Sequence, residues 1–371
     1  MAKVAFITGG NGITGSSLLE YLVKNTDASQ WSELIVTSRS PFKTTVSDPR
    51  ITFIALDYTN DVQSLINKMK DTCSSVTHAY FSSYIHKDDF NELNAANEKL
   101  FANFLDSLLA VAPNLQNCTL QTGGKHYNVH LFPVPSPARE EDPRLDSPIG
   151  NFYYPQEDYL IERQRGQAWT WNVVRPEAII GATSKPNGMN EALTIVLYML
   201  VCAELGVDAP MPTNQRYWEG TDDVSDARII SQLTVWASTS ANTGNQASMS
   251  PTAITFAGTA HFRNPYPKEG DLQLELSLNE WAKDKRQVWD RICDKAGVPQ
   301  AKATWDSGTW AFQDWVFQRT WSATLSMSKA RRFGFDGYID SYQSFTDAID
   351  LFVQRGQIPP VKGASKVNGT A

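Results

Sequence analysis

The chain has 371 residues, a length that fits one large domain or a Rossmann-type core with a second lobe. Hydrophobic residues make up 42% and charged residues 20% of the chain, which excludes an extended disordered protein. The net charge of −7, with no run of more than two basic residues, argues against a nucleic-acid partner.

Apolar runs alternate with segments of helical period from the N-terminus to about residue 205. The runs predict strands at about 3–8, 33–38, 51–56, 76–82, 117–122 and 170–175, and helices at about 13–24, 61–70, 91–111, 154–166 and 188–205. Short buried strands that alternate with helices are typical of an α/β fold. We therefore expect a doubly wound, Rossmann-type parallel sheet with helices on both faces.

The composition changes after about residue 206. The segment 238–275 is polar and predicts loops, with one strand at 253–257, and a tryptophan-rich, mostly helical part follows. These tryptophans either form a core or wall an apolar substrate cavity. The tail from 359 to 371 lacks apolar periodicity and is expected to be disordered.

We accordingly divide the chain into two main parts. A dinucleotide-binding core is expected at 1–180, with returning segments near 215–235 and 250–260. A smaller, mostly helical lobe that mainly binds substrate is expected at 181–358.

Cysteine usage and the lack of targeting signals indicate where the protein works. Cys73, Cys118, Cys202 and Cys293 are widely spaced, which indicates neither a metal site nor a disulfide framework. The first predicted strand starts too early for a signal peptide, and the most apolar stretch, 192–205, is too short to cross a bilayer. We expect a cytoplasmic protein without metal or membrane partner, and homodimer formation stays open.

A glycine-rich turn joins the first predicted strand to the first helix. Gly9, Gly12 and Gly15 are spaced as G-x-x-G-x-x-G, which permits a tight turn, close approach of a pyrophosphate and close packing of the helix. Arg39 directly follows the second predicted strand, at the place where an acid would hold the ribose hydroxyl of NAD. Because arginine accommodates a 2′-phosphate, the pattern predicts an NADP(H) site.

Candidate catalytic groups follow the fifth predicted strand and open the fourth predicted helix. Lys125 lies at the strand end, and Tyr153 and Tyr154 lie at the helix start, so all three can face a bound nicotinamide. A tyrosine hydroxyl stabilises the oxyanion that forms during hydride transfer, and a nearby ammonium lowers its pKa. The usual Tyr-x-x-x-Lys pattern is absent, since Glu157 and Asp158 occupy the fourth positions, so Lys125 is the candidate substitute. The alternative is a surface lysine beside two core tyrosines.

Three segments resemble the signatures of the progesterone 5β-reductase/iridoid synthase family, an atypical branch of the extended short-chain dehydrogenases. They are Leu-Gln-Thr-Gly-Gly-Lys-His-Tyr at 120–127, Asn-Phe-Tyr-Tyr at 151–154 and Glu-Asp at 157–158. The similarity covers most of the chain to about residue 235 and returns after about 285. It implies NADPH-dependent reduction of a carbon–carbon double bond next to a carbonyl. The enolate oxygen would be held by Tyr153 with Lys125, and Tyr154 is the alternative to Tyr153.

The resemblance also implies a set of cofactor contacts around the glycine turn and the strand ends. The set comprises Thr8, Gly9, Asn11, Gly12, Ile13, Arg39, Asp57, Tyr58, Gln121, Thr122, Lys125, Tyr153, Pro176 and Ile179. Two of them have a plain structural alternative, because Asp57 could cap a turn and Pro176 could end a strand.

Two departures limit what the resemblance implies. The family usually has arginine where Gly124 stands, so one contact on the cofactor side is lost. The stretch 245–280 lacks the family's usual Asn-Gly-Asp and Trp-containing helix, so the substrate does not carry over. We expect a bulky, largely apolar carbonyl compound bound between the carboxyl edge of the sheet and the lobe.

Three other functions fit parts of the pattern. A ketone or aldehyde reductase would use the same tyrosine and lysine to polarise its substrate directly. A non-redox cyclase or isomerase would keep NADP(H) as a scaffold. A redox-sensing regulator generally loses the tyrosine and lysine, whereas this chain keeps both.

Overall fold

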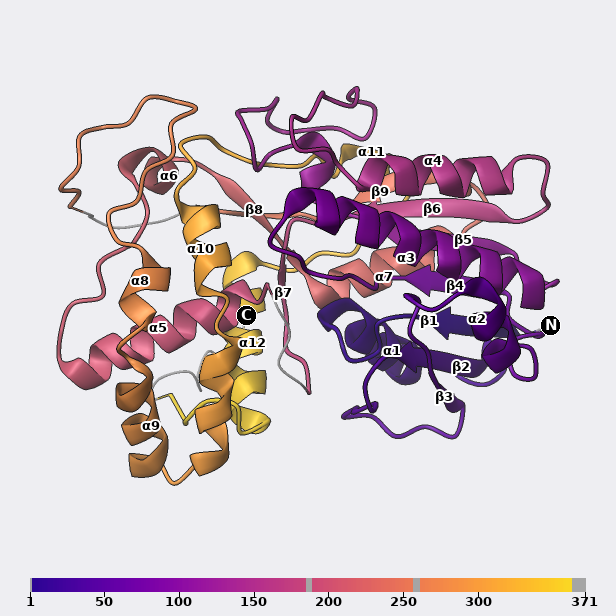
Figure 1. Cartoon of the computed structure of the whole chain (residues 1–371), viewed down its shortest axis with the longest axis horizontal. Helices are drawn as coiled ribbons and strands as arrows, with labels where there is room; N and C mark the ends of the chain where they lie inside the picture. The colour runs from indigo at the N-terminus through magenta and orange to yellow at the C-terminus, as the bar shows by residue number, and fades with distance from the viewer. Residues whose placement is uncertain (1, 185–188, 256–260, 362–371) are drawn as a thin grey trace.

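Seven parallel strands form the main sheet of the protein (Figure 1). This computed structural model describes residues 2–184, 189–255 and 261–361, and the strand order in its main sheet is β3-β2-β1-β4-β5-β6-β9. The strands are β1 Lys3–Ile7, β2 Trp31–Ser38, β3 Ile51–Ala55, β4 His78–Phe81, β5 Asn117–Gln121, β6 Thr170–Arg175 and β9 Gln246–Met249. The predicted doubly wound α/β fold is confirmed, and the first six strands end within two residues of their predicted limits.

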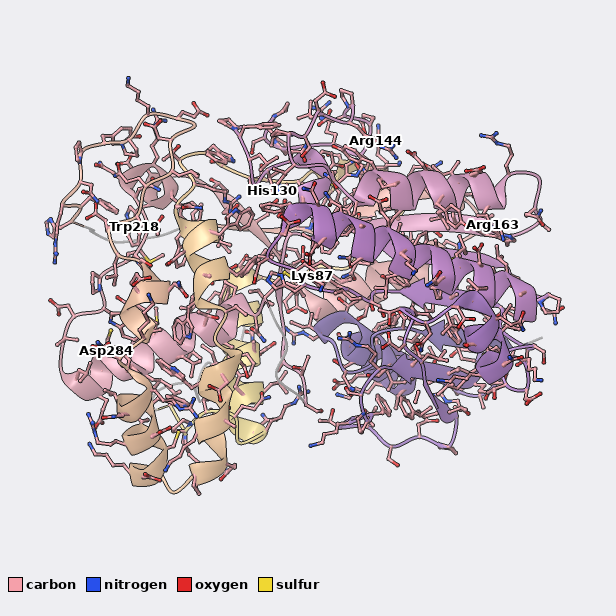
Figure 2. The ribbon with its side chains drawn as sticks, in the orientation of Figure 1. Lys87, His130, Arg144, Arg163, Trp218 and Asp284 are labelled. Atoms are coloured by element: carbon pink, nitrogen blue, oxygen red, sulfur yellow. The ribbon has the colours of Figure 1, made fainter. Side chains whose placement is uncertain are left out.

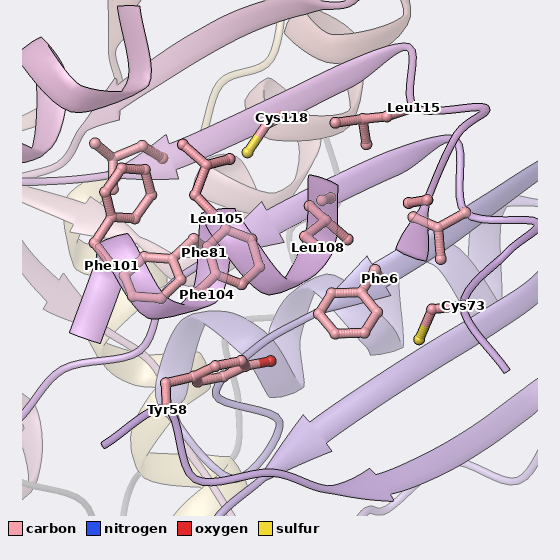
Figure 3. Packing of buried hydrophobic residues seen from close by; sticks show 14 of the residues in the cluster. Phe6, Tyr58, Cys73, Phe81, Phe101, Phe104, Leu105, Leu108, Leu115 and Cys118 are labelled. Carbon is pink, nitrogen blue, oxygen red and sulfur yellow. The ribbon is translucent and has the colours of Figure 1, made fainter. Parts of the chain in front are cut away.

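Helices cover both faces of this sheet. Helices α1 (Ile13–Asn25) and α7 (Ala227–Thr239) pack on one face, and α2 (Val62–Met69), α3 (Phe90–Val111) and α4 (Tyr153–Gln164) pack on the other. Side chains of β1 alternate between the two layers: Ala5 and Ile7 face α1, whereas Phe6 joins the aromatic cluster under α3 shown in Figure 3. The chemistry therefore has to lie at the carboxyl edge of the sheet, because the faces are closed.

The seventh strand lies inside the segment that the sequence predicts as loops. Strand β9 pairs in parallel with β6, and Ala247, Ser248 and Met249 are buried there. The loop prediction is thus wrong at 246–249, and the chain returns to the sheet before the expected range of 250–260. The signal is weak because β9 is short and three of its four residues are polar or small.

A second, three-stranded sheet begins where the main sheet ends. Its order is β10-β8-β7, with β7 at Ala178–Ile180, β8 at Asp222–Asp226 and β10 at Thr252–Ile254. Strand β10 covers the start of the strand predicted at 253–257, and residues 256 and 257 lie outside the described residues. Because β7 follows β6 after only two residues, this sheet links the core directly to the lobe.

The lobe is mostly helical, as predicted, and stands beside the core in Figure 1. It contains α5 Glu191–Leu205, α6 Gln215–Glu219, α8 Leu278–Ala282, α9 Arg286–Lys295, the 3₁₀ helix η2 Pro299–Ser307, α10 Trp310–Phe317 and α12 Ser341–Gln354, while α11 Ser328–Arg332 lies near β9. Trp289 and Trp305 are buried with α5 and α12, so these two tryptophans form a core. At the start of the predicted tail, Pro359 is buried, and the tail beyond residue 361 lies outside the described residues.

The described part of the chain contains neither a membrane-spanning helix nor a cluster of metal-ligating side chains. No helix in those ranges is long and apolar enough to cross a membrane. Within the same ranges, no three His, Cys, Asp or Glu side chains gather in a way that could hold a metal ion.

Candidate functional site

The glycine turn between β1 and α1 has the backbone that a phosphate needs. Gly9 has a φ of 65°, a left-handed conformation that favours glycine, and its carbonyl accepts a hydrogen bond from the Gly12 N–H at 2.7 Å. A Cβ on Gly15 would lie 2.4 Å from the Gly9 oxygen, so α1 can approach the turn only with glycine there. Gly12 caps α1 without a side chain, which leaves the first N–H groups of the helix available to an anion.

Thr8 and Ile13 fix the two ends of this turn. The buried Thr8 hydroxyl accepts a hydrogen bond from the Ser82 N–H at 3.0 Å, and the Ser82 hydroxyl donates back to the Thr8 carbonyl. Ile13 lies close to Gly181, where an added Cβ would be 3.1 Å from its Cγ1 atom. The turn is therefore held between the ends of β1 and β4 and the segment after β7.

Asn11 joins the glycine turn to the loop that follows β2. Its amide donates to the Ser38 hydroxyl at 2.7 Å and accepts from the Lys43 N–H at 3.0 Å. Arg39 is exposed in this loop and forms no ion pair within the described residues. An exposed arginine beside the turn is free to meet a phosphate on the ribose. Lys43, which sequence reasoning did not single out, brings a second cation to the same loop.

The Asp57 side chain lies in the turn after β3, whereas the Tyr58 side chain points into the core. The Asp57 carboxylate accepts a hydrogen bond from the Thr59 N–H at 3.0 Å, as a turn cap does, and its contact with a cofactor stays a prediction. The Tyr58 side chain is buried against Phe81 and Phe104 (Figure 3), and its hydroxyl lies 2.9 Å from that of Thr37. Only the backbone of Tyr58 is therefore left for a ligand.

Both predicted catalytic residues lie in or against the short segment that follows β5. Lys125 lies in the 3₁₀ helix η1 (Gly124–Tyr127), and Tyr153 is the first residue of α4. A Cβ built on Gly123 would lie 3.3 Å from the Tyr153 hydroxyl, so this hydroxyl sits directly over the glycine that precedes η1. The Asn151 amide donates to the Lys125 carbonyl at 2.7 Å, while its own oxygen accepts from the Tyr153 N–H at 3.2 Å. One asparagine thus ties the two residues together through their backbones.

Burial governs the titration of both groups. Burial raises the pKa of Tyr153 above its usual value and lowers that of Lys125. Tyr84 and Glu177 add to the effect of burial and raise the pKa of Tyr153 further, so the lowering expected from a nearby ammonium is not seen. The hydroxyl of Tyr153 makes no hydrogen bond to the described residues, so it is available to a substrate oxygen.

Polar atoms without partners mark the end of β5. Gln121 Oε1 and Thr122 Oγ1 are buried and lack a hydrogen-bond partner within the described residues. Beside them, the Pro176 carbonyl accepts from the Gly124 N–H at 2.8 Å, and Ile179 lies in β7. Unpaired buried polar atoms are rare in folded proteins. Together with the glycine turn, they fit a dinucleotide that runs from α1 to the end of β5.

Glu157 stands where the usual lysine would be and holds the site together. The buried Glu157 carboxylate accepts two hydrogen bonds from Arg175 Nη2, both at 3.1 Å, and lies 3.2 Å from His126 Nδ1. It therefore clamps η1, which carries Lys125, to the end of β6. The cations beside Glu157 keep its pKa below the usual value despite burial.

Tyr154 has a structural role that separates it from Tyr153. Its hydroxyl donates to the His126 carbonyl at 2.7 Å and accepts from the Leu145 N–H at 3.3 Å, and the Arg144 guanidinium covers its ring. Both hydrogen-bonding capacities of this hydroxyl are used within the protein. The geometry therefore favours Tyr153 as the group that faces a ligand.

A small pocket opens beside Lys125. Its volume is about 20 Å³, room for about one water molecule. Phe152 lines it, whereas Tyr153 does not. The Lys125 ammonium lies 5.4 Å from the centre of the Trp315 ring, on α10 of the lobe. Trp315 lies at the junction of lobe and core but does not line this pocket, so the interpretation of the tryptophans as the wall of a substrate cavity stays a prediction.

The Glu177 side chain fills the space that the family's usual arginine at position 124 would need. A Cβ on Gly124 would lie 2.0 Å from the Glu177 carboxyl, so the Glu177 side chain occupies the space into which residue 124 would project. Glu177 Oε1 is buried without a hydrogen-bond partner among the described residues. Burial, followed by the nearby Asp222, raises the pKa of Glu177 well above its usual value.

Glu177→Gln is expected to stabilise the protein more at pH 7 than at pH 5. The folded protein keeps the Glu177 proton after the unfolded chain has lost it, so stability falls as pH rises above the ordinary pKa of glutamate. The slope is about 1.4 kcal/mol per pH unit for one proton. Urea unfolding of the wild-type protein and of Glu177→Gln at the two pH values measures the change in the free energy of unfolding. The exposed Glu162→Gln is the control. An equal effect of Glu177→Gln at both pH values would show that Glu177 is ionised in the folded protein.

Sequence reasoning missed Glu177, His130 and Trp315 as individual site residues. His130 lines the pocket beside Lys125, and Figure 2 shows it at the junction of core and lobe. Glu177 follows the Arg-Pro pair that ends β6, and this proximity was a usable signal. The position of Trp315 depends on how the lobe folds back, for which no local signal exists.

The chain is similar to known proteins over most of its length. Residues 5–259 match the family model described as the PRISE-like Rossmann-fold domain. The short chain dehydrogenase gsfE of Penicillium aethiopicum is 56% identical, over 97% of this chain and 100% of that protein. The (S)-8-oxocitronellyl enol synthase ISY1 of Nepeta racemosa is 32% identical, over 94% of this chain and 91% of its own.

A steroid reductase and a solved structure extend the comparison. The 3-oxo-Delta(4,5)-steroid 5-beta-reductase of Arabidopsis thaliana is 31% identical, over 94% of this chain and 92% of its own. The enzyme WbmH of Bordetella bronchiseptica, solved in complex with NAD⁺, shares the fold with a TM-score of 0.59 at 15% identity, over 96% of this chain and 100% of its own. The resemblance to the progesterone 5β-reductase/iridoid synthase family is confirmed. This chain belongs to the PRISE-like Rossmann-fold family and is an oxidoreductase of the short-chain dehydrogenase/reductase type.

Proposed function

We propose that the protein is an NADPH-dependent reductase of hydrophobic α,β-unsaturated carbonyl compounds. The observation that carries the proposal is the Tyr153 hydroxyl, which lies over Gly123 without a hydrogen bond to the described residues, next to the segment that carries Lys125. Hydride addition to the β-carbon leaves negative charge on the carbonyl oxygen. A hydroxyl donor placed at that oxygen stabilises the charge.

The chain would hold NADPH along the carboxyl edge of the sheet. The N–H groups at the start of α1 would meet the pyrophosphate, Arg39 the 2′-phosphate, and the unpaired Gln121 and Thr122 side chains the nicotinamide half. When bound, this cofactor supplies the hydride. The names of two relatives, a steroid 5-beta-reductase and an enol synthase, support a carbonyl substrate.

The residues of the chain have separate tasks in this reaction. Tyr153 donates a hydrogen bond to the substrate oxygen, and the Lys125 ammonium adds positive charge near it. Glu157 and Asn151 position these two residues through η1 and α4. The Trp315 ring of the lobe lies 5.4 Å from the Lys125 ammonium and would shield it from water. The four cysteines are buried free thiols, which supports a reducing compartment such as the cytoplasm.

The proposal is tested with a panel of enals, enones and simple ketones. For each compound, the consumption of NADPH is measured as a loss of absorbance. We expect turnover of conjugated substrates and a saturated carbonyl product. Turnover of unconjugated ketones to alcohols would favour the carbonyl-reductase alternative, which uses the same tyrosine. Conversion of a substrate without loss of NADPH would favour a cyclase or isomerase.

A further inference from the structure

His130 is held at the junction of core and lobe by its neighbours in the chain. Asn128, two residues earlier, has a φ of 57° and is fully buried, and its amide donates to the Leu145 carbonyl at 3.0 Å. The Trp321 indole N–H donates to the Val129 carbonyl at 3.0 Å. The segment that carries His130 is thus fixed from the core side and from the segment after α10.

The imidazole shares the pocket with Lys125. The other lining groups are mostly apolar and come from the start of α3 and the loop before α4: Phe90, Leu93, Asn94, Ile149, Gly150, Asn151 and Phe152. The ring of Trp315 lies 5.9 Å from that of His130 and 5.4 Å from the Lys125 ammonium. His130 is therefore a polar group in a mostly apolar pocket, placed next to the amine that the proposed reaction uses.

His130 has an unused hydrogen-bonding atom. Its Nδ1 is buried and has no partner within the described residues. Burial, and then the positive charges of Lys125 and Arg319, lower the pKa of His130 to about 3. The ring is thus neutral at physiological pH and has one N–H donor. Lys125 and Arg319 also make the electrostatic potential at the His130 ring positive, which favours an electron-rich partner there.

We propose that His130 donates a hydrogen bond to a second oxygen of the substrate, one that is distinct from the carbonyl conjugated to the reduced double bond. This inference rests on the proposed enone reduction and narrows its substrate class. The substrate is an enone that carries a further carbonyl or ether oxygen, rather than a hydrocarbon skeleton with a single ketone. A buried polar atom without a partner discriminates against ligands that leave it unpaired.

The test compares two bicyclic enones that differ in one oxygen. The first carries a second ketone away from the enone, and the second has a methylene group at that place. The variant His130→Phe keeps a planar ring and removes both nitrogens, and the exposed His261→Phe is the matched control. For each protein, the ratio of kcat/KM for the two enones is measured, together with calorimetric binding of their saturated products in the presence of NADP⁺.

We expect the wild-type protein to prefer the diketone, and His130→Phe to lower this preference by about 10-fold in both kcat/KM and binding. A preference that is unchanged in His130→Phe would overturn the inference and leave the proposed function intact. If the wild-type protein reduces neither enone, the proposed function fails for these compounds. In that case the binding ratio alone decides the role of His130.

Discussion

Tyr153→Phe is expected to lower kcat by about 10²–10³, with a much smaller change in KM. The hydroxyl lies over Gly123, has no hydrogen bond to the described residues and belongs to a half-buried side chain, so its loss removes a donor that acts mainly on the developing oxyanion. Steady-state kinetics with a conjugated enone measures the effect.

Tyr154→Phe is the matched control for this prediction. The Tyr154 hydroxyl donates to the His126 carbonyl, so its removal should lower the free energy of unfolding by about 1 kcal/mol and change kcat little. Thermal unfolding and kcat of the two variants separate these roles. A loss of rate confined to Tyr154→Phe would show that the second tyrosine faces the substrate.

Arg39→Ala is expected to weaken NADPH binding by about 10- to 100-fold and to leave NADH binding nearly unchanged. An arginine that binds a phosphate through two hydrogen bonds contributes only to the cofactor that has this phosphate. Calorimetric titration with both cofactors measures the difference.

The control for this variant is Arg165→Ala, which removes an exposed arginine just after the last residue of α4. Arg165→Ala should leave the affinities for NADPH and NADH unchanged. Equal affinity of the unmodified protein for NADPH and NADH would refute the assignment of Arg39 to the 2′-phosphate.

The core of the fold could be predicted because its signals are local. Buried parallel strands need apolar runs, and the glycine turn needs its spacing, so both are visible within short windows of sequence. Strand β9 was missed because Gln246, Ala247 and Ser248 lack a strand pattern, and its burial depends on pairing with β6. Tertiary pairing can outweigh a weak local preference.

The site could be predicted only in part for a related reason. Lys125 and Tyr153 lie at the ends of predictable elements, so their position at the carboxyl edge of the sheet follows from its topology. Glu177, by contrast, matters because glycine at position 124 leaves space for its carboxyl, and His130 because it shares the pocket with Lys125 and lies beside Trp315 of α10. Such contacts join residues that are distant in sequence or turned toward each other by a loop, and no periodic pattern encodes them.

The position of transferred deuterium tests the proposed reaction most directly. The protein is incubated with an α,β-unsaturated ketone and with NADPH that carries deuterium at the transferred position, and the product is analysed by NMR. We predict a saturated ketone with deuterium on the β-carbon. Deuterium on the carbinol carbon of an allylic alcohol, or product formation without any deuterium, would contradict conjugate reduction.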